Sequence, residues 1–165
     1  MASFRVKSLA AAAGLFGAVA ATPVMACDSF VAHGAGDTRS VAYVNVGEET
    51  LSQGDMRLGG RTLNDDDGEP LGVYSWVSTL QEPPDENGAG TVAIDLYLEL
   101  EGGQIMTHAL TRNTGRFDDL DAVIVQPPIE FAIVGGTGDY ARARGISRLI
   151  VSGSDTVFVV DVFCD

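Results

Sequence analysis

Hydrophobic and polar residues alternate along most of the chain beyond residue 38, in short runs separated by glycine, proline, asparagine and aspartate. Alternation with a period of two is typical of strands that bury one face, and the separating residues favour turns. The runs predict eight strands, at 39–46, 54–63, 70–81, 90–101, 104–112, 129–135, 143–152 and 155–163. Because no amphipathic helix of any length is predicted, the pattern indicates an all-β fold, either an antiparallel sandwich or a closed barrel.

The segment 90–112 alternates most clearly. One face of its first strand is wholly aliphatic, with Val92, Ile94, Leu96, Leu98 and Leu100. This column must be buried, because exposing it would leave a large apolar area in water. Gly102-Gly103 can supply the positive φ angles of a two-residue hairpin turn. That turn predicts that Leu100 pairs with Ile105, and Tyr97 with His108.

The opposite face of this hairpin gathers groups that can carry chemistry: Asp95, Tyr97, Glu99 and His108. One interpretation makes this the solvated outer face of the sheet. The other makes Tyr97 and His108, flanked by the carboxylates, the polar end of a ligand cavity. The pattern allows both interpretations.

The last strand, 155–163, is apolar on both faces, with Val157, Phe158, Val159, Val160, Val162 and Phe163. In a single closed barrel, one of these faces would meet water. An exposed apolar stripe usually marks a contact surface, so we expect self-association. The alternative is that an extra segment, residues 28–38, covers the stripe.

Residues 1–26 have the features of a secretory signal peptide. Arg5 and Lys7 precede the apolar stretch 9–21, and Ala26 ends a pattern typical of a cleavage site. Cleavage after Ala26 would leave residues 27–165 as a single domain, in the periplasm or outside the cell. The alternative is an N-terminal membrane anchor, for which the apolar run is short.

The chain has two cysteines, Cys27 and Cys164. In an oxidising compartment we expect a disulfide between them, which would close nearly the whole mature chain into one loop. The alternative treats Val24–Cys27 as a lipoprotein cleavage site, with Cys27 lipidated and Cys164 left over. A metal site built from two such distant cysteines and from His33 or His108 has little support.

The chain is strongly acidic, since 10 basic and 23 acidic residues give a formal net charge of −13. Nucleic acids and anionic membrane surfaces would repel it, so neither is an expected partner. A hydrophobic content of 45% is too high for a disordered acidic polymer. The composition therefore indicates one folded acidic domain.

The segment Phe131–Gly145, FAIVGGTGDYARARG, resembles the strand–turn–strand signature of the allene oxide cyclase and dirigent proteins. Its glycines suit a backbone bend that side chains would obstruct; they are Gly135, Gly136, Gly138 and Gly145. Residues 54–72 and 98–107 resemble the early and central hairpins of the same family. The resemblance covers about residues 40–163, nearly all of the mature chain.

This resemblance implies an eight-stranded antiparallel up-and-down β-barrel, lipocalin-like in shape, with an interior pocket for a small, largely apolar or aromatic molecule. Family members are commonly oligomers, with trimers in plants, which suits the apolar last strand and implies a homo-oligomer, either a dimer or a trimer. Their activities include cyclisation of a fatty-acid epoxide and stereochemical guidance of phenoxy-radical coupling, and bacterial relatives include polyketide cyclases. A shaped cavity that holds one conformer of a reactive substrate is the common theme. None of these activities needs a metal or an organic cofactor, so no cofactor is expected.

Two functional hypotheses follow. In the first, the protein is an isomerase-type cyclase or a stereocontrolling protein, with Tyr97 and His108 as polar handles, Glu99 or Asp95 as a carboxylate, and Arg144 as an anion or carbonyl anchor. In the second, it is a non-catalytic carrier or structural module of the same fold. The second is favoured by a departure from the family, because residues 59–62 stand where allene oxide cyclases usually have an Asn-Pro pair.

Overall fold

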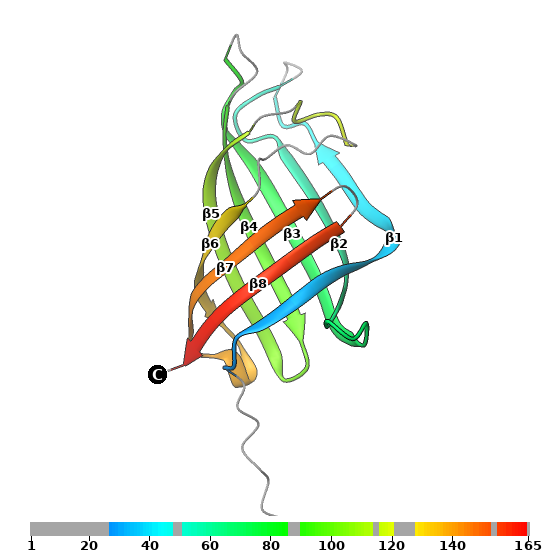
Figure 1. The fold of residues 1–165 in the computed structure, drawn as a ribbon. Coiled ribbons are helices and arrows are strands. Elements are labelled where there is room, and N and C mark those ends of the chain that lie inside the picture. The colour runs from blue at the N-terminus through cyan, green and yellow to red at the C-terminus, as the bar shows by residue number, and fades with distance from the viewer. Residues whose placement is uncertain are drawn as a thin grey trace, which may run out of the picture.

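The computed structural model describes residues 27–47, 51–85, 90–113, 116–120, 128–152 and 155–164. Eight strands follow one another in chain order, each antiparallel to the next, and β1 pairs with β8 to close the barrel (Figure 1). They are β1 (Phe30–Val44), β2 (Met56–Asn64), β3 (Pro70–Glu82), β4 (Gly90–Leu100), β5 (Gly103–Asn113), β6 (Ile129–Gly136), β7 (Ala143–Ser152) and β8 (Asp155–Cys164). The eight-stranded antiparallel up-and-down barrel is confirmed, and the sandwich alternative is wrong.

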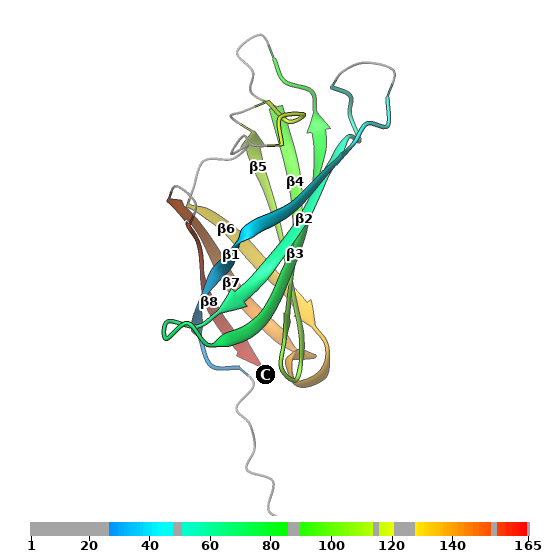
Figure 2. The same ribbon diagram turned by 90° about the vertical axis from the view of Figure 1, so that its right-hand side faces the viewer.

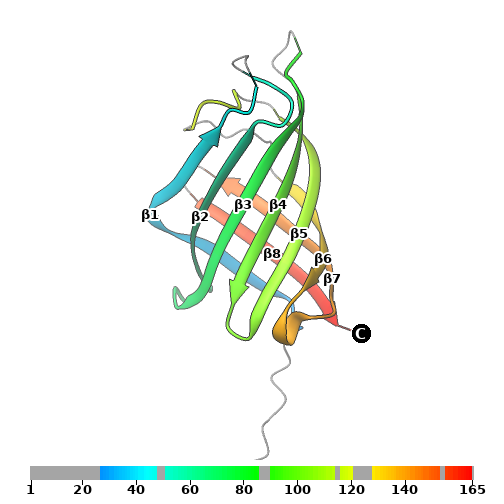
Figure 3. The ribbon, with the colours of Figure 1, turned by 180° about the vertical axis from the view of Figure 1, so that it is seen from behind.

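The two ends of the barrel differ. The turns after β2 and β4, the short 3-10 helix η1 (Gly138–Tyr140) and the last residues of β8 lie at one end, at the bottom of Figure 1. We call the other end, where β1, β3, β5 and β7 finish, the mouth. Figure 2 shows both ends from the side, and Figure 3 shows the wall formed by β3, β4 and β5 from behind.

Strand β1 begins nine residues earlier than the sequence predicts. Its first part, Phe30–Gly34, pairs with β8. His33–Ala35 and Ser40–Val44 pair with β2, with a shift of register between these two stretches. The interpretation of residues 28–38 as a covering segment is therefore wrong, because most of them belong to the strand that closes the barrel. Glycine, aspartate and threonine in this stretch hide the alternation that would have identified it as a strand.

The predicted turn between β4 and β5 is wrong by one position, which shifts the pairing by two residues. Leu100 pairs with Gly103 and Leu98 with Ile105, so Glu101 and Gly102 form the two-residue loop. Both registers place the same residues on each face, because a shift of two residues preserves side-chain parity. The correction changes the partner of His108 from Tyr97 to Asp95.

The inner face of the barrel carries the apolar core. The predicted column of β4 points inward, and Val92, Ile94, Leu96 and Leu98 are all buried. Across the interior, the ring of Tyr74 on β3 packs edge to face against that of Phe158 on β8, with the ring centroids 4.9 Å apart. Strand β8 is apolar on both faces, as predicted. Phe158, Val160 and Val162 are buried, while the outward Phe163 is 54% exposed.

The segment from Gly135 to Gly145 turns the chain from β6 through η1 into β7. At Gly136, a Cβ atom would lie 2.3 Å from the carbonyl oxygen of Gln104. Gly138 has a φ of +59°, and a Cβ atom there would lie 2.0 Å from the carbonyl oxygen of Gly102. Backbone packs against backbone at both positions, which leaves no room for a side chain.

A disulfide joins Cys27, just before β1, to Cys164 at the end of β8, across 137 positions of sequence. It fastens the two terminal strands below their shared ladder, where Phe30 pairs with Val160. The predicted lipidation alternative would require Cys27 to be free of this bond. None of the described residues forms a helix with the length and hydrophobicity that a bilayer crossing requires.

Candidate functional site

The predicted polar handles lie on the outside of the barrel. Tyr97 is 37% exposed, and His108 is also exposed on the outer face of the neighbouring strand. The Nδ1 atom of His108 lies 2.8 Å from a carboxylate oxygen of Asp95, in an exposed pair. The interpretation of this face as the polar end of an interior cavity is therefore wrong, and the solvated outer face is the correct one.

Glu99 and Arg144 also face outward. The guanidinium of Arg144 donates a hydrogen bond of 2.6 Å to the carbonyl oxygen of Ala143, and it lies over the outside of β6 near Gly135. The structure thus brings Asp95 and His108 together but leaves Arg144 on a different part of the wall. A catalytic role for any of these residues stays a prediction, and it would have to operate on the outer surface.

Strand β2 reverses the usual placement of polar and apolar residues. Arg57 is fully buried inside the barrel, whereas the next residue, Leu58, is 38% exposed on the outside. Arg61 shares the inward face of Arg57, and each of these arginines has an inward-facing partner on β3. Such a reversal of the binary pattern is expected where function, and not folding, selects the residue.

A glycine between these arginines makes room for the chain's one tryptophan. A Cβ atom on Gly59 would lie 2.9 Å from the indole of Trp76, so the ring lies directly against the backbone of β2. Trp76 pairs with Gly59 on one side and with the buried Leu96 on the other. The inner wall therefore presents an aromatic surface between two cationic positions.

The mouth is organised around a buried carboxylate, Asp55. It accepts a hydrogen bond of 2.5 Å from the hydroxyl of Tyr43 and others from the backbone amides of Ser52 and Val46. Burial by itself would raise the pKa of Asp55, but these hydrogen bonds together outweigh it and hold the pKa below its usual value. The same burial, together with the hydrogen bond to Asp55, raises the pKa of Tyr43, so this phenol stays neutral.

Residues 116–120 pack into the mouth. Phe117 is fully buried, and its ring meets that of Tyr43 edge to face at 6.3 Å. Arg57 reaches up from the interior and donates a hydrogen bond of 3.0 Å to the carbonyl oxygen of Leu120. The buried guanidinium therefore connects the inner wall to the segment at the mouth.

Two buried polar side chains have no hydrogen-bond partner in the described part of the chain. They are Asn113, at the mouth end of β5, and Ser147, in the middle of β7; both are fully buried. Neither the amide oxygen nor the amide nitrogen of Asn113 is satisfied, nor is the hydroxyl of Ser147. Leaving a buried polar group unsatisfied costs about 1–3 kcal/mol, so such groups need an explanation.

Sequence reasoning missed these interior groups, although parity could have found them. Counting by twos from the apolar Ile105 along β5 leads to Asn113, and counting from Ala143 along β7 leads to Ser147. Arg57 offers no such signal, because alternation alone favours Met56 and Leu58 for the inside of β2. We take the inner wall that carries Arg57, Trp76 and the two unsatisfied groups as the candidate site.

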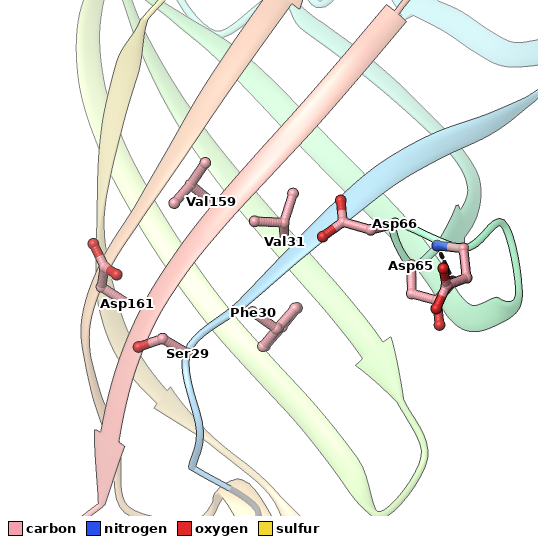
Figure 4. Close-up of a pocket in the computed structure, with 8 residues that line it drawn as sticks. Ser29, Phe30, Val31, Asp65, Asp66, Val159 and Asp161 are labelled. Carbon is pink, nitrogen blue, oxygen red and sulfur yellow. Dashed lines mark hydrogen bonds between the residues drawn. The ribbon is translucent and has the colours of Figure 1, made fainter.

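A groove of about 510 Å³ lies outside the barrel, between the start of β1, the turn after β2 and β8 (Figure 4). Three of the carboxylates that line it have partners within the chain: Asp66 lies 2.7 Å from His33, Asp161 lies 2.7 Å from Arg148, and Asp65 accepts hydrogen bonds from the amides of its own turn. Within the ranges that the structure describes, no three histidine, cysteine or acidic side chains are grouped so that they could hold a metal ion.

No protein-family model matches the sequence, and no curated protein does. Solved structures do match the fold. Pyocyanin demethylase superposes with a TM-score of 0.61 at 21% identity, over 82% of this chain and 100% of that one. The likeness is one of fold.

Two cyclases share the same architecture. One is described as a nonspecific haem-binding cyclase that catalyses [4 + 2] cycloaddition during neoabyssomicin biosynthesis, with a TM-score of 0.54 at 15% identity. The other is the Diels–Alderase AbmU from Streptomyces koyangensis, with a TM-score of 0.55 at 14% identity. They match 81% and 80% of this chain, which spans only 64% and 59% of theirs. The barrel is therefore one that small-molecule enzymes use.

Proposed function

We propose that the interior of the barrel binds one small, largely apolar or aromatic molecule, and that the chain is an exported barrel of the allene oxide cyclase/dirigent-like type. The observation that carries the proposal is the pair of fully buried, unsatisfied side chains, Asn113 and Ser147. In a barrel filled only by its own side chains, such groups would lower the free energy of unfolding without any functional benefit. A ligand with hydrogen-bonding atoms would satisfy them.

The dimensions of the barrel support the binding of a small ligand in its interior. The interior of an eight-stranded barrel is wide enough either to be filled by side chains or to hold one small ligand. Many inward positions here carry small residues, among them Ala32, Gly34, Gly59, Ser78, Ala109, Ala143 and Ser147. Aromatic and aliphatic side chains cover much of the remaining inner wall, a lining typical of sites for apolar molecules.

The test uses Trp76, whose ring lies on the inner wall. Titration with the neutral probe N-phenylnaphthylamine should change the emission of Trp76 and should saturate at one probe per chain. Solvent extraction of the purified protein, followed by mass spectrometry, should recover a stoichiometric small molecule or leave a protein that takes up the probe. A protein that neither releases a molecule nor binds the probe would contradict the proposal.

A second candidate function is that the interior guides a cyclisation. The observation that favours it is the fold shared with the solved structures described as [4 + 2] and Diels–Alder cyclases. Holding reacting groups in one orientation lowers the entropic cost of such a ring closure. The experiment is turnover of polyene, epoxide or phenol substrates by the wild type, Asn113→Leu and His108→Ala. For an interior reaction, Asn113→Leu should be impaired and His108→Ala should match the wild type. Loss of activity in His108→Ala alone would move the reaction to the outer face, and no turnover by any form would leave the carrier function.

We also propose that the chain self-associates through the outer face of β6, β7 and β8. Four large apolar side chains on this face are at least 40% exposed: Val134, Ile146, Ile150 and Phe163. Light scattering should give a mass above the monomer for the wild type and a lower mass for Phe163→Ser. Leu58→Ser, on another wall, is the control and should keep the wild-type mass. A monomeric wild type would refute the proposal.

Export after cleavage behind Ala26 is proposed as well. The residues of the expected signal peptide lie outside the described part of the chain, and the support comes from the disulfide of Cys27 and Cys164. N-terminal sequencing of the protein recovered from outside the cytoplasm should begin at Cys27. A lipid attached to Cys27 would favour the lipoprotein alternative instead.

A further inference from the structure

The two unsatisfied groups lie at different depths of the barrel. The ladders pair His108 with Ala132 and Ala132 with Ile146. Counting one step toward the mouth along each strand places Ala109, Phe131 and Ser147 in one row. Asn113 is four residues further along β5 than Ala109, which corresponds to about 13 Å along the strand.

The wall between these two groups is largely apolar, with Thr111 as the polar inward position on β5 between Ala109 and Asn113. Ala109, Ile129 and Phe131 are buried there, and Ile94 adjoins Ala109 on β4. A molecule that reaches both Asn113 and Ser147 must therefore be elongated, lie along the barrel, and have an apolar middle. A compact bicyclic molecule could satisfy only one of the two groups.

The chemistry of the two groups limits what the ends of this molecule can be. The amide of Asn113 offers a donor and an acceptor side by side, and it carries no charge. The hydroxyl of Ser147 both donates and accepts, and it too is neutral. Neither group can offset the cost of burying an ion, so each end that it meets is expected to be neutral. The cationic inward positions, Arg57 and Arg61, lie on β2, away from the strands β5 and β7 that carry these two groups.

We propose, as an extension of the proposed function and resting on it, that the interior takes an elongated neutral molecule with hydrogen-bonding groups at two points separated by about 13 Å along the direction of β5. Its end at the mouth is a primary amide or a comparable donor–acceptor group, which pairs with Asn113. Its deeper group is a hydroxyl or carbonyl, which pairs with Ser147. Asn113 and Ser147 are thus the residues that determine specificity.

The experiment compares four probes by titration of Trp76 fluorescence: ω-hydroxydodecanamide, dodecanamide, hexanamide and the anion ω-hydroxydodecanoate. The first should bind best, about five- to tenfold more tightly than dodecanamide, because it makes one more buried hydrogen bond. Hexanamide and the anion should bind at least tenfold more weakly than ω-hydroxydodecanamide.

Two variants assign the contacts. Ser147→Ala should bind ω-hydroxydodecanamide and dodecanamide with equal affinity, and Asn113→Leu should lose about five- to tenfold in affinity for both amides. Ser75→Ala changes an exposed serine on β3 and should behave as the wild type. Thermal unfolding checks that the variants fold: both interior variants should melt at or above the wild-type temperature, since each removes an unsatisfied buried group.

The outcomes separate the two proposals. If Ser147→Ala keeps the preference for the hydroxylated amide, or if hexanamide or the anion binds as well as the long amide, the inference is wrong while interior binding stands. If Trp76 responds to none of the four probes and not to N-phenylnaphthylamine, the proposed function itself fails.

Discussion

Asp55 illustrates how one side chain can hold the mouth of the barrel. Its carboxylate joins the end of β1, through Tyr43 and Val46, to the turn at Ser52 that leads into β2. Its own backbone carbonyl accepts a hydrogen bond from the amide of Leu80 on β3. A single fully buried residue therefore ties three consecutive strands together beside the segment that carries Phe117.

Asp55→Asn should lower the free energy of unfolding by about 2 kcal/mol at neutral pH, because hydrogen bonds to a charged group are worth more than those to an amide. The native pKa of Asp55 lies below its usual value, so its stabilising contribution is complete above about pH 4. The contribution is lost as the pH falls through the native pKa. Denaturant unfolding from pH 7 downward should therefore show the gap between wild type and Asp55→Asn closing in acid.

Tyr43→Phe is the matched control, because it removes one of the hydrogen bonds to Asp55 and leaves the backbone amides in place. It should cost about 1 kcal/mol. If the difference in unfolding free energy between wild type and Asp55→Asn stays constant down to about pH 2, the charge of Asp55 does not stabilise the fold.

At the level of strands, the number and most of the boundaries of the elements could be predicted, because alternation with a period of two survives wherever one face meets the core. Two features could not. The first part of β1 carries too few apolar residues to show a period, and its place is determined by β8 and β2, which lie far away in the sequence. The turn after β4 could be placed in either of two registers, since both keep Leu98 and Leu100 on the same face.

The candidate site was harder to predict than the strands. A face with Tyr97 and His108 resembles a pocket lining in composition, yet the same residues suit a solvated wall. The buried position of Arg57 runs against the local pattern and depends on what packs around it in three dimensions. Parity could have placed Asn113 and Ser147 on the inner face, but their significance lies in missing partners, which a sequence does not reveal.

Two glycines separate the effects of backbone conformation and of close packing. Gly68, in the turn after β2, has a φ of +85° and no atom within 4 Å of the position of a Cβ. Gly68→Ala should therefore cost only the strain of a positive φ, about 1 kcal/mol. Gly138→Ala adds a collision with the backbone of Gly102 and should cost about 3 kcal/mol or more.

Chemical denaturation of both glycine variants measures the difference. Equal losses would mean that η1 moves away from the turn after β4 without cost, and that the contact between them does not contribute to the closure of this end. Normal ligand binding by Gly68→Ala would serve as the check that the barrel itself is intact.

At the level of the whole molecule, each described strand pairs with its chain neighbours, and among these strands β1 and β8 are the pair that joins distant parts of the sequence. The disulfide lies beside this pairing and joins residues 137 positions apart. It restricts the unfolded chain more than a bridge across a short loop would.

Cys27→Ser combined with Cys164→Ser should lower the free energy of unfolding by up to about 5 kcal/mol, the value that chain entropy gives for so long a loop. Reduction of the wild type should reproduce the unfolding curve of the double variant. If wild type and double variant unfold alike under oxidising conditions, the bridge makes no contribution to stability.

The position of Cys164 has a practical consequence. The carboxyl-terminal end of β8 emerges beside η1, at the opposite end from Asp55 and Phe117. An affinity tag or a surface linker attached there would hold the molecule by the end opposite the mouth, so that the mouth faces the solution. Immobilised in this way, the protein could be screened against libraries of compounds on a sensor chip without the support blocking access.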